Sequence, residues 1–144
     1  MVLLIDTNVV LDFMLKRNDF YEDAYKVVEL CAKEEIKGYV ALHSISNIWY
    51  ILRGVDDTTK REHLKHICRI LEVCAIPHKD VESALDKTDF KDFEDCLQDF
   101  CAVTVNADYI ITRNTADFVH AETEAITPQD FLEKYKARIA SRVL

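Results

Sequence analysis

The sequence predicts an α/β fold in which helices cover a central parallel sheet. Short runs of branched and aliphatic residues, beginning with residues 2–5, alternate along the chain with longer segments whose apolar residues recur every three or four positions. A continuous apolar run is typical of a strand that is buried on both faces, as in a parallel sheet. Only two glycines and two prolines are present, which favours helices over long loops. The 144 residues fit one domain, 1–144, with three layers and a sizeable core.

Strand and helix signals alternate from one end of the chain to the other. The expected strands are residues 2–5, 39–42, 72–76, 108–111 and 125–126. The expected helices are residues 7–15, 19–35, 44–53, 59–71, 78–85, 88–105 and 129–138. Asp19, Ser44 and Thr127 are expected N-caps, and Gly38 is expected to end the second helix. Ile48, Ile51 and Leu52 are expected to face inward from the third helix.

The charge balance bears on the function in two ways. A net charge of −8 argues against a protein that holds nucleic acid by bulk electrostatics. It does not exclude a nuclease, because carboxylates that bind metal ions add to the acidity and a bound cation reverses the local field. The most basic stretch is the outer face of the helix expected at 59–71, with Lys60, Arg61, Lys65, His66 and Arg69. The pattern leaves open whether this face is solvated or contacts RNA or a partner.

The sequence predicts neither a membrane segment nor a secretion signal. No apolar run approaches the roughly 20 residues that cross a bilayer. The N-terminal run is short, lacks a basic leader and is interrupted by Asp6. We therefore expect a cytoplasmic protein with no membrane partner. The five cysteines form no C-x-x-C pair and are expected to be mostly buried thiols.

Acidic residues occupy three comparable places in the expected fold. Asp6 ends the first strand, Asp117 follows the fourth strand, and Asp92 and Asp95 lie three residues apart at the start of a helix. These places can converge at the carboxyl edge of a parallel sheet. Carboxylates gathered there repel one another unless a cation lies between them, and hard oxygen ligands favour Mg²⁺ or Mn²⁺. Taken singly, each aspartate is explained more simply as a helix cap or a turn residue, and this explanation weakens when all of them fall at one edge of the sheet.

Three segments together resemble the PIN-domain family of metal-dependent ribonucleases. They are residues 4–9, residues 92–98, and residues 107–114 with Asp117 and Phe118. The chain is most similar to the small stand-alone members, which include the VapC-type toxins of toxin–antitoxin pairs. This resemblance implies a sheet in the order 3-2-1-4-5 and an acidic pocket that binds Mg²⁺ or Mn²⁺. It also implies hydrolysis of RNA phosphodiester bonds by a metal-activated water.

The resemblance assigns roles to individual residues. Asp6, Asp95 and Asp117 match the family's catalytic, metal-binding acids, and Asp92 is a further candidate ligand. The residues expected to support the site are Asn8, Asn47, Thr112 and Asn114. Arg113 is a candidate for contacting an RNA phosphate, or it is simply a loop residue exposed to solvent. The resemblance further implies an antitoxin protein as a partner and a homodimer, formed through the helices between residues 44 and 71.

One departure from the family pattern keeps other functions open. The family usually has a glutamate where Asn47 aligns, and the neighbouring Ser44 and Ser46 supply no acid in its place. Metal affinity should therefore fall, and the number of metal ions stays open. A PIN-like module that binds RNA or protein without cutting is one alternative. An aspartate-nucleophile phosphatase is another, although Asn8 breaks the D-x-D pattern of that class.

Overall fold

The computed structural model describes residues 1–143 and contains one five-stranded parallel sheet. The strands are β1 (Val2–Ile5), β2 (Lys37–Ala41), β3 (Glu72–Cys74), β4 (Tyr109–Ile111) and β5 (Ala125–Ile126). Their order is β3-β2-β1-β4-β5, and every neighbouring pair is parallel. The expected order and direction of the strands are confirmed. The order reverses at β1, which places the end of that strand at the edge where parallel sheets form their sites.

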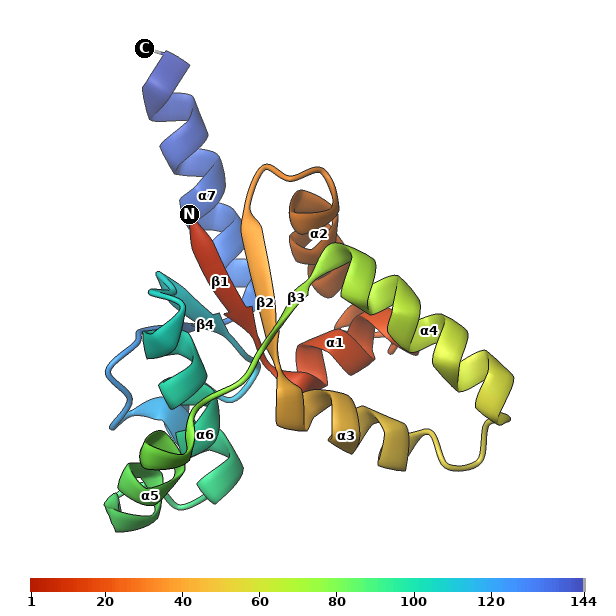
Figure 1. Cartoon of the computed structure of the whole chain (residues 1–144). Coiled ribbons are helices and arrows are strands. Elements are labelled where there is room, and N and C mark those ends of the chain that lie inside the picture. The colour runs from red at the N-terminus through yellow and green to blue at the C-terminus, as the bar shows by residue number, and fades with distance from the viewer. Residues whose placement is uncertain (144) are drawn as a thin grey trace.

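Helices cover both faces of the sheet and give the molecule three layers. They are α1 (Thr7–Met14), α2 (Tyr21–Ala32), α3 (Leu42–Ile51), α4 (Asp57–Ile70), α5 (His78–Asp86), α6 (Phe93–Thr104) and α7 (Pro128–Val143), with a 3₁₀ turn, η1 (Thr115–Phe118). Figure 1 shows α2 and α4 on one side of the sheet and α5 and α6 on the other. No helix within residues 1–143 is long and apolar enough to cross a membrane.

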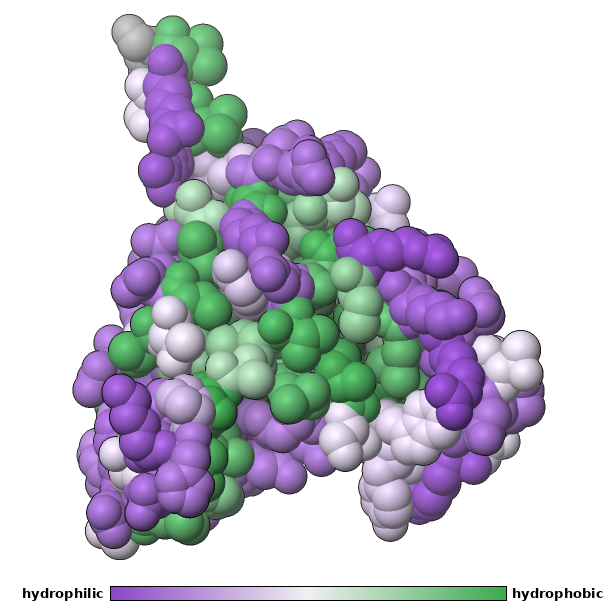
Figure 2. Space-filling view, in the orientation of Figure 1, coloured by the Kyte–Doolittle hydropathy of each residue, from purple (hydrophilic) through white to green (hydrophobic). Residues whose placement is uncertain are grey.

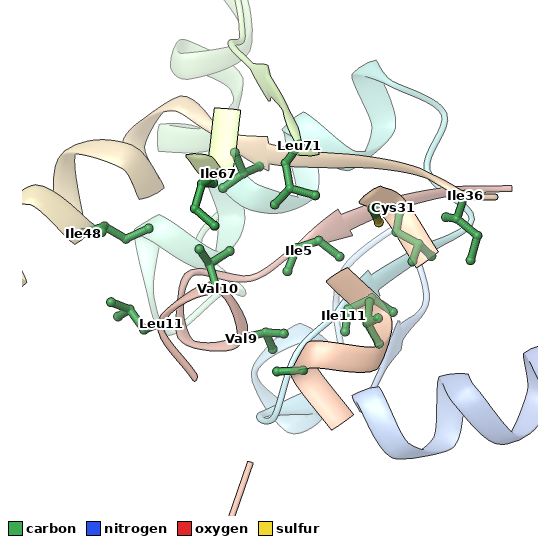
Figure 3. Close-up of a cluster of buried hydrophobic side chains, with 14 of the residues drawn as sticks. Ile5, Val9, Val10, Leu11, Cys31, Ile36, Ile48, Ile67, Leu71 and Ile111 are labelled. Carbon is green, nitrogen blue, oxygen red and sulfur yellow. The ribbon is translucent and has the colours of Figure 1, made fainter. Parts of the chain in front are cut away.

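Alternation along the strands divides the core into two clusters. Leu3 and Ile5 point to one face of β1, where α1, α2, α4 and α7 pack, and Leu4 points to the other, where α6 packs. Figure 3 shows the first cluster, in which Val9 and Val10 of α1 lie beside Ile5 and Ile111. These side chains are fully buried. The strand end that carries Asp6 is therefore anchored in the core from both faces.

Several predicted boundaries and faces are wrong. Gly38 does not end a helix. It lies inside β2, where a Cβ would come within 2.6 Å of the Sγ of Cys31 and the Cδ2 of Leu71, so the strand runs too close to its neighbours for a side chain. Ser44 is not an N-cap, because α3 already begins at Leu42; the Ser44 hydroxyl instead accepts a hydrogen bond from Thr7.

The predictions for α3 and α4 fail at two side chains. Ile51 is expected to face inward but is 43% exposed, because α3 ends at this residue. Its side chain lines a hollow at the carboxyl edge of the sheet instead of packing in the core. Lys60 was expected on a basic outer face but is buried. Its Nζ lies 3.9 Å from the ring centroid of Trp49, so an aromatic face replaces the lost water.

Other features of the chain agree with expectation in part. Asp19 does not cap α2, which begins at Tyr21 without a side-chain cap. Thr127 does cap α7, since its hydroxyl accepts a hydrogen bond from the backbone N–H of Asp130. That helix continues to Val143, beyond the expected end at 138. Four of the five cysteines are buried free thiols as predicted, and only Cys68 is exposed.

Candidate active site

Asp6 ties together three elements at the carboxyl edge of the sheet. The side chain is 5% exposed and follows β1 directly. Its Oδ1 accepts a hydrogen bond from the Gln98 amide of α6 at 2.5 Å, and its Oδ2 accepts one from the Thr112 hydroxyl, just after β4, at 2.8 Å. The carboxylate makes no capping bond to α1, so a helix cap does not explain it. The predicted supporting role of Thr112 is thus a direct contact with Asp6.

The predicted acids meet Asp6 around one hollow of about 360 Å³. The residues that line it are Asp6, Thr7, Asn8, Asn47, Tyr50, Ile51, Asp92, Glu94, Asp95, Gln98, Asn114 and Asp117. We call this hollow the acidic pocket. Five of its lining residues are carboxylates and none is basic. The structure therefore brings Asp6, Asp92, Asp95 and Asp117 together from three separate parts of the chain.

The clustering of carboxylates affects the pKa of Asp95. Partial burial raises the pKa of its carboxyl group to about 7, and the neighbouring Asp92, Asp6 and Asp117 add to the shift in the same direction. Asp92 differs from it, because it caps α6 by accepting a hydrogen bond from the backbone N–H of Glu94 at 2.8 Å. The alternative role as a helix cap therefore applies to Asp92. It does not remove Asp92 from the pocket wall.

The donors of the acidic pocket suit a hard divalent cation. They are carboxylate and amide oxygens, the ligands that Mg²⁺ and Mn²⁺ prefer. Within the described residues the Oε1 atom of Gln98 is buried without a hydrogen-bond partner, although its amide nitrogen is held by Asp6. In residues 1–143, no three acidic, histidine or cysteine side chains already stand close enough to hold an ion. The donor set fits a cation, and ligation would need the carboxylates to close in.

Glu94 is a pocket residue that sequence reasoning missed. The Asn47 amide nitrogen donates to its Oε2 at 3.1 Å, so an acid does stand beside the position where the family glutamate was expected. The sequence offered no obvious acid in place of the glutamate, whereas the structure places Glu94 next to Asn47. The two residues are 47 positions apart. No local pattern could have linked them, and the sequence pointed only to the neutral Ser44 and Ser46.

Arg113 does not line the acidic pocket. Its Nε lies 2.9 Å from the Oδ2 of Asp12, and its guanidinium group stacks on Phe20, 4.0 Å from the ring centroid. Asp12 is 1% exposed and also contacts Arg17, whose Nη1 lies 3.4 Å from Oδ1. Arg113 is thus neither a bare loop residue nor a wall of the pocket. It fixes the loop between Thr112 and Asn114 to α1.

A second hollow, of about 460 Å³, lies on the other side of α3. Its walls are mostly apolar and include Ile45 and Trp49 of α3, Leu64 of α4, and Ile76 after β3. We call it the apolar groove. In Figure 2 apolar residues gather across the centre of the same face, around β3. No carboxylate is among its described lining residues, so the oxygen ligands for a metal ion belong to the acidic pocket.

Comparisons with known proteins agree with this geometry. A PIN domain family model matches residues 2–116. No curated protein matches the sequence.

Three solved structures share the fold over most of their length. VapBC2 from Rickettsia felis, bound to a DNA fragment from its promoter, matches with a TM-score of 0.68 at 18% identity, over 88% of this chain and 98% of that chain. FitAB bound to an IR36 DNA fragment matches with a TM-score of 0.66 at 15% identity, over 89% of this chain and 95% of that chain. VapBC-1 from nontypeable Haemophilus influenzae matches with a TM-score of 0.64 at 12% identity, over 90% of this chain and 99% of that chain.

Proposed function

Because the chain belongs to the PIN domain family, whose members are typically nucleases, we propose that it is a metal-dependent endoribonuclease that hydrolyses RNA phosphodiester bonds. The observation that carries the proposal is the acidic pocket. Five carboxylates surround one hollow at the switch point of the sheet, with no basic side chain among the described lining residues. Such a cluster is costly in the absence of a cation.

The proposed cofactor is Mg²⁺ or Mn²⁺, held by Asp6, Asp95 and Asp117 with Asp92 as an additional ligand. When bound, such an ion polarises the phosphoryl oxygens and lowers the pKa of a water molecule that attacks phosphorus. The chain's own contribution is orientation. Gln98 and Thr112 hold the Asp6 carboxylate with neutral donors, which leaves its negative charge uncompensated.

Asp95, Asn47 and Glu94 set the conditions for the reaction. Near neutral pH, Asp95 retains a proton for part of the time in the metal-free protein, and metal binding would release it. Asn47 and Asn8 present amide groups to the pocket, and Glu94 supplies a carboxylate beside Asn47. The weaker donor at position 47 is therefore partly offset, which favours an active enzyme over a non-cutting module.

We further propose that the enzyme is the cytoplasmic toxin of a toxin–antitoxin pair. The solved structures with the same fold include VapBC2 and FitAB, both bound to DNA fragments. An antitoxin that inserts an arginine or lysine side chain into the acidic pocket would neutralise it by charge-assisted hydrogen bonds. A homodimer is part of the same proposal, and the apolar groove along α3 and α4 is the surface available for either contact.

The two rival functions are less well supported. A phosphatase would need Asp6 as a free nucleophile, whereas both of its oxygens accept hydrogen bonds from Gln98 and Thr112. A binding module without activity would not need uncompensated carboxylates around a hollow, because they repel RNA.

The experiment is cleavage of a labelled single-stranded RNA by the metal-free protein, with and without added Mn²⁺. Wild type should cut only with Mn²⁺, and Asp6→Asn and Asp95→Asn should lose the activity. Glu62→Gln, which removes an exposed carboxylate on α4, is the matched control and should cut normally. Equal cleavage by all four proteins would exclude a metal-dependent site at these residues. A stoichiometric RNA complex that forms without metal and is never cut would favour the binding module.

A further inference from the structure

Two exposed aromatic rings stack with arginine side chains, one in the wall of the acidic pocket and one against the loop that leads to Asn114. Tyr50, near the end of α3, lines the pocket and is 66% exposed, an unusual position for a large aromatic side chain. The guanidinium carbon of Arg53 lies 4.7 Å from its ring centroid, and the Nη1 atom of Arg53 donates to the Tyr50 carbonyl at 3.3 Å. The ring is thus held against a cation while its other surface faces solvent.

The second stack is formed by Phe20 and by Arg113, which lies in the loop after β4. Arg113 stands between Thr112, which donates to Asp6, and Asn114, which lines the pocket. Its guanidinium group lies 4.0 Å from the ring centroid of Phe20, and Phe20 is 43% exposed. The Phe20–Arg113 stack is therefore joined to the pocket through the two residues on either side of Arg113.

Asp12 fixes the plane of this second stack. The buried carboxylate contacts both Arg113 and Arg17, so one negative charge is shared by two cations and a net positive charge remains. A buried ion pair contributes little more stability than an apolar pair of similar volume. What it adds is orientation, because it holds a planar guanidinium group in one place.

We propose that the Tyr50–Arg53 and Phe20–Arg113 stacks bind the bases that flank the scissile phosphate of a single-stranded RNA. The inference rests on the proposed ribonuclease function. The acidic pocket attracts a phosphate only through its cation, so other side chains must bind the neighbouring nucleotides. Arginine side chains bind phosphates, and aromatic rings stack on bases of any sequence. Bases inside an RNA duplex are already stacked and are not available to either ring.

The test is the affinity of the full chain for a fluorescent 12-nucleotide RNA, measured by anisotropy as a single strand and as a duplex. Ca²⁺ is added because it takes the same oxygen ligands. Wild type should prefer the single strand. Tyr50→Ala and Phe20→Ala should each weaken single-strand binding about tenfold, the usual effect of losing one stacked base, and leave duplex binding unchanged. Tyr50→Phe and Phe20→Tyr should bind like wild type.

Matched controls separate stacking from general damage. Tyr25 is 42% exposed on α2 and lines no part of the acidic pocket, so Tyr25→Ala should bind RNA normally if it remains folded by circular dichroism. Arg53→Ala should reduce the slope of log affinity against log salt by about 0.7, the value for one phosphate contact on a single strand. Lys136→Ala, which removes a cation from α7, should leave the slope unchanged.

Three results would overturn the proposal. The first is equal affinity of wild type for single strand and duplex. The second is unchanged single-strand binding by both alanine variants; if Mn²⁺-dependent cleavage then still requires Asp6, the ribonuclease stands and only the base-binding role fails. The third is a change in molecular mass on light scattering for Tyr50→Ala, which would assign this surface to a second copy of the chain. Loss of binding by both variants in a protein that never cuts RNA would support the stacks and reject the nuclease.

Discussion

Asp6 and Asp12 are both buried aspartates, one just before α1 and one within it, but their partners differ in charge. Asp12 is paired with two cations, Arg113 and Arg17, at 2.9 and 3.4 Å. Asp6 receives only neutral donors, from Gln98 and Thr112. Along one short segment the fold thus compensates one buried charge and leaves the other uncompensated.

The difference separates a structural carboxylate from a functional one. A buried charge is stable only when something opposite pairs with it. For Asp12 the protein supplies that charge, and in doing so it fixes the loop that leads to Asn114. On the proposed function the counter-charge of Asp6 comes from a metal ion in solution, because its neighbours in the acidic pocket are further carboxylates.

The largest predicted effect comes from Asp6→Asn. Cleavage of RNA with Mn²⁺ should fall about a thousandfold, because a bound metal ion contributes several kcal/mol to the stabilisation of developing charge. The melting temperature without metal should not fall, because the new amide oxygen still accepts the Thr112 hydrogen bond and like-charge repulsion is relieved. The Gln98 amide can turn so that its unpartnered Oε1 accepts from the new amide nitrogen. If the variant loses both its activity and a large part of its melting temperature, Asp6 has a structural role.

Asp12→Asn should show the opposite pattern. It leaves two guanidinium groups without their buried counter-charge, so the free energy of unfolding should fall by about 3 kcal/mol. Urea unfolding measures this change. At low temperature, where the variant is still folded, Mn²⁺ affinity should be close to wild type. A loss of metal affinity without a loss of stability would reverse the roles of the two aspartates.

A smaller effect is expected at Asn47. Asn47→Glu adds a carboxylate to the pocket wall and should tighten Mn²⁺ binding about tenfold, since affinity rises with ligand charge. Asn47→Gln lengthens the side chain without adding charge and serves as the control. Calorimetric titration of both variants gives the comparison. Equal affinities would mean that Glu94 already supplies the charge that position 47 lacks.

A further effect, on stability alone, is a dependence on pH through Asp95. The pKa of this group is about 7 in the folded chain and about 3.8 unfolded. The folded state therefore binds the extra proton, and its stabilising effect is lost as pH rises from about 4 through 7. Relative to Asp95→Asn, metal-free wild type should lose melting temperature over this range. Added Mn²⁺ should stabilise wild type more at pH 8 than at pH 5, and equal shifts at both pH values would contradict the account.

The sequence was sufficient for the strands of the sheet and for four of the five acids of the pocket. Apolar runs marked the strands, and the position of Asp6 after β1 placed it at the edge where Asp95 and Asp117 also lie. These are local signals, because strand ends and helix starts are written in neighbouring residues.

What escaped prediction depends on contacts between distant residues. Gln98 lies 92 positions from Asp6, and Arg113 lies 101 positions from Asp12. Periodicity shows which face of an element is buried but not which polar side chains meet across elements. The prediction for Lys60 was wrong for the same reason, because its burial depends on the contact with Trp49 of another helix.

Calorimetric titration of Mn²⁺ into the metal-free protein measures whether the uncompensated carboxylates around Asp6 take their counter-charge from solution. Wild type and Glu62→Gln should bind Mn²⁺ with equal affinity, and Asp6→Asn should bind at least about tenfold more weakly. Equal Mn²⁺ affinity in wild type and Asp6→Asn would contradict the assignment of Asp6 as a metal ligand.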